Sequence, residues 1–262
     1  LDAHRHGVAV RLVVDSETYN DEVPERLRSA GIAVISDRRQ ELMHNKFTVL
    51  DGQEVWTGSL NLSTGGTYSD YNNLVRIRST RLAQDYTAEF EEMFINDSFG
   101  PGSPANTPHP QLSVDSIPLE VYFSPDDGVL RRILELVNGA QQSVDFMAYS
   151  FTSDELAQAL LERAAAGIDV KGVFEADQYI SNVGTEFDTL LTAGLDVRLD
   201  GNPNHMHHKV IVIDEHIVLT GSYNFSANAE ERNDENLLVI DDPALARLYL
   251  TEFNRVFTLA SP

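Results

Sequence analysis

The chain has 262 residues, a net charge of -22 and no cysteine. This length allows one large domain or two of ordinary size, each with a complete hydrophobic core. The absence of cysteine excludes disulfides, thiolate nucleophiles and cysteine-ligated zinc sites. Because both halves are acidic, the charge argues against the broad basic surface with which proteins hold nucleic acid. The sequence also contains no apolar run long enough to cross a membrane.

In chain order, residues 7–15 are expected to form the first strand, because their pattern returns in residues 167–175 of the later half. The segment 44–51 follows, with the sequence HNKFTVLD, and Gly-Ser-x-Asn comes after it at 58–61. Beyond these, residues 99–110 contain four prolines and two glycines, a composition typical of an extended linker. The sequence therefore predicts a first lobe over 1–98, a linker over 99–111 and a second lobe over 112–262.

The second lobe alternates strands and helices, which predicts an α/β fold. The predicted strands are 119–123, 143–149, 168–175, 195–199, 207–213 and 216–220. The predicted helices are 126–139, 153–166, 183–193 and 243–257. Residues 209–213 are apolar on both faces, as expected for an interior strand of a sheet that helices cover on both sides.

The segment 44–51 recurs as HHKVIVID at 207–214, and Gly-Ser-x-Asn follows it again at the same spacing. The offset of 163 positions (207 minus 44) also relates Tyr86 to Tyr249. A match over a whole half indicates two duplicated lobes rather than a solenoid, whose repeats are much shorter. The motif contains Lys46 and Lys209, two of only three lysines in the chain, so these are not generic solubility charges.

Each copy of the motif combines residue types that suit phosphoryl transfer. Side chains alternate along a strand, so His44 and Lys46 are expected to point the same way, as are His207 and Lys209. An imidazole can act as a nucleophile or proton donor near neutral pH, while an ammonium offsets the charge of phosphoryl oxygens. Hydroxyl and amide groups of Gly-Ser-x-Asn could hold the same oxygens. These residues are Ser59, Asn61, Ser222 and Asn224.

His-x-Lys-x4-Asp followed by Gly-Ser-x-Asn, twice in one chain, resembles the phospholipase D superfamily. The resemblance covers nearly the whole chain. It implies two similar lobes related by a pseudo-twofold axis, each a mixed, mostly parallel sheet flanked by helices. It also implies that one histidine attacks phosphorus to give a phosphohistidine, while the other protonates the leaving oxygen and then activates water. No metal and no cofactor are expected, because the sequence shows no cluster of histidine and carboxylate near either motif.

The resemblance assigns a role to each motif residue. His44 and His207 are the catalytic pair, Lys46, Lys209, Asn61 and Asn224 bind phosphate, and Ser59 and Ser222 support them. Asp51 and Asp214 are expected to be structural, and His208 to be a solvated or structural neighbour. An acidic residue that orients a histidine is expected at Glu235, whereas the matching position of the first copy is Asn72. Because such partners come from the opposite lobe, we expect His44 to be the nucleophile and His207 the acid and base.

The alignment of the two halves predicts that the first lobe is incomplete. Leu1 matches Leu161, in the middle of a predicted helix, so roughly fifty residues of this lobe are expected to be missing. Any targeting peptide would lie there too, so the compartment stays open. Since the two lobes already supply both half-sites, we expect no homodimer to be required.

The motif recognises only the phosphodiester, so the substrate remains open between alternatives. We expect hydrolysis of a phospholipid or similar small diester, with some transfer to alcohols, because the chain is acidic and lacks a basic, aromatic strip. A metal-independent endonuclease of the same superfamily is the first alternative, since a compact two-lobe architecture would also suit it. A binding module that retains the fold without catalysis is the second.

Overall fold

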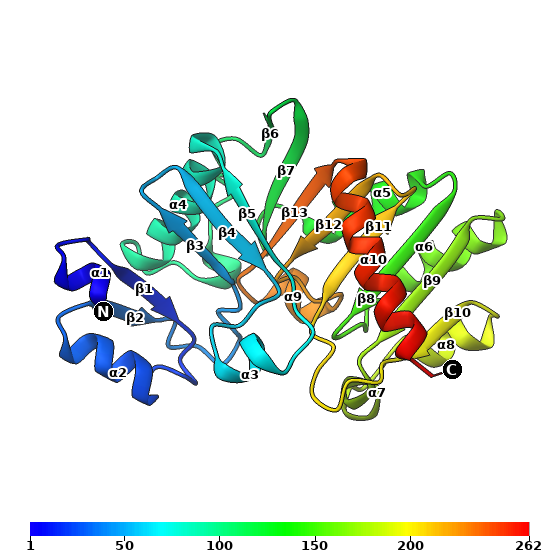
Figure 1. Ribbon diagram of the computed structural model, residues 1–262, viewed down its shortest axis with the longest axis horizontal. Coiled ribbons are helices and arrows are strands. Elements are labelled where there is room, and N and C mark those ends of the chain that lie inside the picture. Colours follow the sequence, from blue (N-terminus) through cyan, green and yellow to red (C-terminus); the bar gives the residue numbers. More distant parts are fainter. Residues whose placement is uncertain (262) are drawn as a thin grey trace.

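The computed structural model describes residues 1–261, which form two lobes side by side (Figure 1). The elements of the first lobe are α1 (Asp2–Arg5), β1 (Arg11–Val14), α2 (Glu22–Ser29), β2 (Ala33–Ser36), β3 (Phe47–Leu50), β4 (Glu54–Gly58), α3 (Thr64–Tyr68), β5 (Leu74–Arg78) and α4 (Thr80–Phe94). In the described chain, no helix is long and apolar enough to span a membrane.

The elements of the second lobe follow a short 3-10 helix, η1 (Gly100–Gly102). They are β6 (Gln111–Val114), β7 (Ile117–Ser124), α5 (Val129–Gly139), β8 (Ser143–Ala148), α6 (Asp154–Ala165), β9 (Asp169–Phe174), α7 (Ala176–Ser181), α8 (Phe187–Thr192), β10 (Asp196–Leu199), β11 (Lys209–Ile213), β12 (Ile217–Gly221), α9 (Ala227–Glu231), β13 (Glu235–Asp241) and α10 (Pro243–Leu259).

The second lobe is built on one eight-stranded sheet with the order β10-β9-β8-β11-β12-β13-β7-β6. Only β10-β9 and β9-β8 are parallel pairs, and every other pair in this sheet is antiparallel. The expected α/β class and mixed sheet are confirmed, but the expectation of a mostly parallel sheet is wrong. The reason is the motif half of the lobe, where β11, β12 and β13 follow one another as an antiparallel meander rather than through helical crossovers.

Helices cover both faces of this sheet. Along each strand the buried side chains alternate between two clusters, one against α5, α6 and α8 and the other against α10. In β11, for example, Ile211 and Ile213 face the first cluster, whereas Val210 and Val212 face the second. Figure 1 shows α10 crossing the sheet over β11 and β12. The prediction that this strand is interior and apolar on both faces is confirmed.

The sequence reading missed several elements of the second lobe. It overlooked β13, which begins at Glu235, contains the apolar residues 237–240 and lies buried along most of its length. It also overlooked β6, α7 and α9, and it placed one helix over 183–193 where the structure has the shorter α8. Such short elements depend on tertiary packing more than on local pattern.

The predicted linker is only partly extended. Phe99 is buried, and the amide of Gly100 donates a hydrogen bond of 2.6 Å to Asp234 Oδ1. Gly100 has a φ of +56°, and a β-carbon there would collide with the guanidinium of Arg39. The start of this segment therefore packs against the second lobe, while the lobe boundary within 99–111 stays a prediction.

In the first lobe, the strands form two separate sheets, β1-β2 and β3-β4-β5. Their counterparts in the second lobe, β9-β10 and β11-β12-β13, are joined by β8. Among residues 1–261 no strand lies between β1 and β3, and the exposure of β3 reflects this. Leu50 is 43% exposed, whereas its counterpart Ile213 is 1% exposed.

The two lobes share a core and are tied by contacts that come in matched pairs. Tyr86 of α4 packs with Val121, Phe123 and Leu238 of the second lobe. Thr57 donates to Asn236 Oδ1 at 2.8 Å, and its counterpart Thr220 donates to Asn73 Oδ1 at 2.8 Å. The hydroxyls of Tyr86 and Tyr249 reach the same two acceptors at 3.2 and 3.1 Å. This pairing supports the expected pseudo-twofold relation between the lobes.

Candidate active site

Each motif is anchored to the opposite lobe by its backbone. The amide of His44 donates to the carbonyl of Asp234 at 2.9 Å, and the amide of His207 donates to the carbonyl of Tyr71 at 2.9 Å. These bonds belong to two matching parallel bridges, Met43 with Asp234 and Tyr71 with Met206. The motifs therefore enter β3 and β11 at the junction of the lobes, where their side chains converge.

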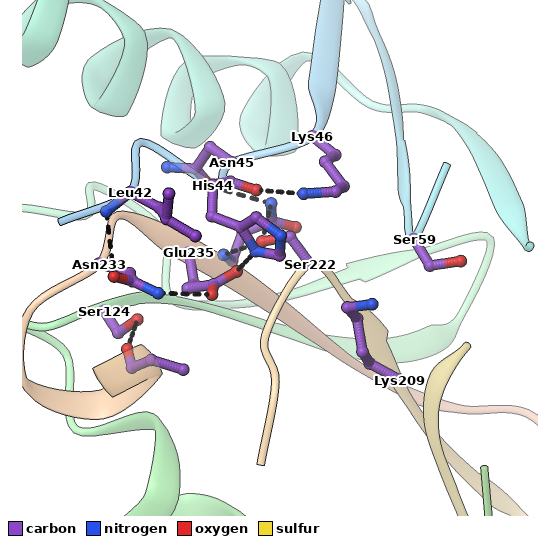
Figure 2. A network of polar contacts seen from close by, with 12 residues as sticks. Leu42, His44, Asn45, Lys46, Ser59, Ser124, Lys209, Ser222, Asn233 and Glu235 are labelled. Carbon is purple, nitrogen blue, oxygen red and sulfur yellow. Dashed lines mark hydrogen bonds and ion pairs between the residues drawn. The ribbon is translucent and has the colours of Figure 1, made fainter. Parts of the chain in front are cut away.

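His44 is held by a carboxylate from the second lobe. Its Nδ1 lies 2.6 Å from Glu235 Oε2, and the Glu235 side chain is fully buried (Figure 2). Since Nδ1 donates to this carboxylate, Nε2 is the nitrogen that can act on a substrate. The sequence-based pairing of Glu235 with a histidine of the opposite lobe agrees with this geometry.

The Nδ1 atom of His207, unlike that of His44, has neutral partners. This atom lies 2.9 Å from Asn72 Oδ1 and 3.0 Å from the carbonyl of Ser59, both in the first lobe. Asn72 directs its oxygen this way because its Nδ2 donates to the carbonyl of Gly66 at 2.9 Å. Both partners accept, so Nδ1 carries the proton in the neutral ring and Nε2 has the free lone pair. The two half-sites therefore differ in charge, as the exchange of Glu for Asn predicts.

The two lysines make identical bonds. Lys46 Nζ donates to the carbonyl of His44 at 2.9 Å, and Lys209 Nζ donates to the carbonyl of His207 at 2.9 Å. Burial lowers the pKa of Lys46 to about 8, against the opposing charges of Glu235 and Asp15. Burial and the nearby ammonium of Lys46 lower the pKa of Lys209. Two cations that share a buried space provide a place for an anion.

The charges of the two lysines also act on the pKa of the two histidines. Burial lowers the pKa of His207, and the positive charges of Lys209, Lys46 and His44 lower it further. Burial also lowers the pKa of His44, although the Glu235 carboxylate opposes this effect. Figure 2 shows His44, Lys46 and Lys209 around a common space at the junction of the lobes.

The serines lie behind this site rather than in it. Ser59 Oγ donates to Asn72 Oδ1 at 2.8 Å and accepts from the amide of Asn73 at 3.0 Å. Ser222 Oγ accepts from the amide of Asn236 at 2.9 Å. Both serines are fully buried, so they position the segments that carry Asn72 and Glu235. This fits the supporting role that the motif predicts for them.

The two asparagines of Gly-Ser-x-Asn differ from each other. Asn61 is exposed, whereas Asn224 is half-buried and its Oδ1 has no hydrogen-bond partner within residues 1–261. Binding of phosphate by either side chain stays a prediction.

Asp51 and Asp214 lie at the far ends of their strands, away from the histidines. Both adopt a φ of +53°, and Asp214 accepts bonds from the amides of Gln141, Gln142 and Ser143 at 3.0, 2.7 and 3.0 Å. A turn held in this way agrees with the structural role predicted for Asp214. Asp51 is exposed, and its side chain has no catalytic contact in the described chain.

His208 is structural and not solvated. It is 1% exposed, receives a bond from Asn73 Nδ2 at 3.2 Å and lies 3.3 Å from Glu252. Its counterpart Asn45 bridges Glu89 and Asn236 at 2.8 and 2.9 Å. The residue that follows each motif histidine therefore forms a hydrogen bond across the lobe junction.

The structure corrects the expectation that no cluster of histidine and carboxylate lies near the motifs. Glu175, Asp177 and His205 come together, with one ligand atom from each within 4.8 Å of the others. His205 Nδ1 already pairs with Glu175 Oε1 at 3.2 Å. The sequence reading missed this group because Glu175 and His205 are thirty positions apart and carry no spacing signal.

Comparison with known proteins identifies the family. The model of the family described as "Cardiolipin synthase, PLD-like domain" matches residues 1–94 and 133–257, well over half of the chain. The chain belongs to the phospholipase D-like family. Both motifs, His44 with Lys46 and His207 with Lys209, lie within the matched residues.

Curated relatives from this family are similar over about half of the chain. A human mitochondrial cardiolipin hydrolase is 33% identical over 136 residues, which cover 52% of this chain and 54% of that protein. A phospholipase D of Rickettsia bellii is 33% identical over 155 residues, which cover 56% and 75%. The chain thus spans little more than half the length of the human relative.

Two solved structures are similar in fold to this chain. Nuc from Salmonella typhimurium, a phospholipase D family member, has a TM-score of 0.51 at 32% identity and covers 55% of this chain and 95% of its own. Phosphatidylserine synthase from Haemophilus influenzae has a TM-score of 0.73 over 96% of this chain and 74% of its own. At 14% identity, the second likeness shows the fold alone, and it extends over both lobes.

Proposed function

We propose that this protein is a metal-independent phosphodiesterase that hydrolyses phospholipid phosphodiesters through a phosphohistidine, with some transfer of the phosphatidyl group to alcohols. The observation that carries the proposal is the junction of the lobes, where two imidazoles with free Nε2 atoms adjoin the ammonium groups of half-buried Lys46 and buried Lys209. A phosphodiester is an anion that needs a nucleophile, a proton donor and positive charge, and this site offers all three.

In the first step, His44 Nε2 attacks phosphorus and the bond from phosphorus to the leaving oxygen breaks. The Glu235 carboxylate stabilises the positive imidazole that forms, because it accepts a hydrogen bond of 2.6 Å from Nδ1–H. His207 gives its Nε2 proton to the leaving oxygen. Burial and the positive charges of Lys209, Lys46 and His44 lower the pKa of His207, so a bound phosphate that offsets these charges favours its protonated form.

In the second step, water attacks phosphorus and His207 Nε2 accepts a proton from it. The bond between phosphorus and His44 Nε2 breaks, which releases a phosphomonoester and restores both rings. Where an alcohol takes the place of water, the same step gives transfer. The ammonium groups of Lys46 and Lys209 hold the phosphoryl oxygens in both steps.

The substrate class is tested with two assays in the presence of a chelator. One follows head-group release from phospholipid vesicles, including cardiolipin and phosphatidylcholine, and the other follows cleavage of single-stranded DNA. Lipid is favoured because relatives are named cardiolipin hydrolase and phospholipase D, and because a net charge of -22 opposes a polyanion. Lipid turnover that persists with chelator supports the proposal.

The alternative is a metal-independent endonuclease that uses the same His44 and His207 chemistry. Cleavage of DNA without lipid turnover would replace the lipid proposal with this one. Loss of lipid turnover on chelation, with recovery on added Zn²⁺ or Mn²⁺, would instead make the Glu175, Asp177 and His205 group a metal site. Inactivity in both assays would favour a binding module.

A further inference from the structure

The two lysines have the same hydrogen bond but different surroundings. Lys46 is partly buried and lies in the field of Glu235 and Asp15. Lys209 is 1% exposed, and within residues 1–261 no carboxylate lies within 4.0 Å of its Nζ. An ammonium has three donors, and His207 O is the only hydrogen-bond acceptor that Lys209 Nζ has in this part of the chain.

The group next to the Lys209 ammonium is the ring of Tyr149. Nζ lies 4.4 Å from the centre of this ring. The same ring packs edge to face against the imidazole of His207, with 4.5 Å between centres and 68° between planes. Tyr149 therefore touches both reactive side chains of the second half-site and no other aromatic residue of the chain does so within residues 1–261.

Tyr149 is held in place at both ends. It follows β8 directly, and its amide donates to the carbonyl of His208 at 2.9 Å. Its hydroxyl accepts from Gln178 Nε2 at 3.3 Å, at the start of α7. A ring fixed by the sheet on one side and by a helix on the other can hold its neighbours in a defined geometry.

We propose that Tyr149 is a positioning residue of the second half-site, whose ring keeps the Lys209 ammonium charged and fixes the orientation of His207. This proposal rests on the proposed function, because it assumes that both groups act on phosphate. The face of an aromatic ring attracts a cation, and the attraction is strongest where water is excluded. The ring, and not the hydroxyl, supplies this effect.

Other charges also act on Lys209 and belong in the account. The ammonium of Lys46 opposes its charge, while the carboxylates of Glu235, Glu175 and Asp70 favour it from neighbouring elements. These carboxylates act at a distance, whereas the Tyr149 ring is in contact. Removal of the ring quadrupole should therefore make Lys209 lose its proton at lower pH while the carboxylates stay in place.

The chain suits a direct test, since Lys46, Lys171 and Lys209 are its only lysines. With ¹³C-labelled lysine, NMR titration of the three Cε signals follows each ammonium without any need for activity. We compare the wild type with Tyr149→Phe, Tyr149→Leu and a variant that carries 3,4,5-trifluorophenylalanine at position 149. Fluorination weakens the ring quadrupole but keeps its shape, so this variant remains informative if the leucine variant does not fold.

The expected result is specific to one lysine. Tyr149→Phe leaves the Lys209 titration unchanged, while the fluorinated and leucine variants move it to lower pH by about one unit. Lys171, which is paired with Asp169 on the surface, keeps its titration in all variants. The titration of Lys46, whose ammonium acts on Lys209, does not move to lower pH in any variant. An unchanged Lys209 signal in the fluorinated variant, or a shift in Tyr149→Phe equal to that in Tyr149→Leu, would overturn the proposal.

Kinetics on the soluble diester bis(4-nitrophenyl) phosphate then test whether the charge of Lys209 affects turnover. We expect kcat/KM to fall about tenfold or more in Tyr149→Leu, with the alkaline limb of its pH profile moved to lower pH, and to stay within about twofold in Tyr149→Phe. Tyr68→Leu, at an exposed position of α3, is the matched control. If the wild type has no activity, the proposed function fails, whereas the NMR titration still decides the role of the ring.

Discussion

At the residue scale, the two half-sites differ most in the side chain that contacts the histidine. His44 contacts Glu235, whereas His207 contacts Asn72. We expect Glu235→Gln to lower kcat by about a hundredfold, because the amide no longer stabilises a positive His44. The carboxylate raises the pKa of His44 against the effect of burial, so its removal lowers that pKa further. The nucleophile must be neutral, and the acid limb of kcat/KM should therefore move to lower pH.

The control is Glu231→Gln, which replaces an exposed carboxylate at the end of α9. Its pH profile should keep both the acid and the alkaline limb of the wild type. A Glu235→Gln profile whose acid limb stays in place would remove Glu235 from its assigned role.

Lys46 gives a prediction about stability. Its pKa falls from 10.5 to about 8 in the folded protein, so between these values the unfolded chain binds more protons and stability rises with pH. At pH 7 the wild type carries the full cost of the buried charge. Lys46→Met should thus raise the free energy of unfolding by about 1 to 2 kcal/mol at pH 7, with a smaller gain at pH 10.

Urea unfolding of both proteins at pH 7 and pH 10 checks this prediction. Lys171→Met, at an exposed ion pair, is the control and should show no such gain. A gain for Lys46→Met that is equal at both pH values would contradict the assigned pKa.

Much of the site could be predicted at this scale, and the failures have a common cause. The spacing of His44, Lys46 and their copies indicated the chemistry, since alternation along a strand is a local property. Tyr149 could not be predicted, because it meets the motif only through the pairing of β8 with β11. The group around His205 could not be predicted either, because Glu175 reaches His205 from the end of β9. No local pattern encodes such a contact.

At the element scale, the two copies of the motif strand have different environments. All of β11 is buried between helices, whereas β3 alternates between half-buried and exposed residues and has no neighbour on one side among the described strands. We expect the amides of β3 to exchange with solvent at least tenfold faster than those of β11. Hydrogen exchange followed by mass spectrometry on peptides that cover both strands measures this.

The amides of β1 and β9 provide a second comparison, in which we expect β1 to exchange with solvent faster than β9. Equal protection of β3 and β11 would show that the first lobe is as stable locally as the second. The sequence identified both copies of the strand, but alternation along a strand does not show how much of each copy its neighbours cover. It also overestimated the parallel content of the large sheet, because strand direction depends on the connections beyond each strand.

At the scale of the whole molecule, the site exists only where the lobes meet. His44 takes its partner from the second lobe and His207 takes its partners from the first, so neither half-site is complete within one lobe. The duplicated motif predicted this arrangement through its resemblance to a two-lobe family. The shared core around Tyr86, Val121 and Leu238 could not be predicted, because it joins residues from distant parts of the chain.

The most direct test of a single shared site is to trap the covalent intermediate. The variant His207→Ala is mixed with bis(4-nitrophenyl) phosphate, whose leaving group needs no proton, and is quenched at alkaline pH for peptide mass spectrometry. One 4-nitrophenolate leaves in the first step, so we expect a 4-nitrophenyl phosphoryl group on His44, and none in the double variant with His44→Ala. This group on another residue, or normal turnover of a natural diester by His207→Ala, would contradict the account.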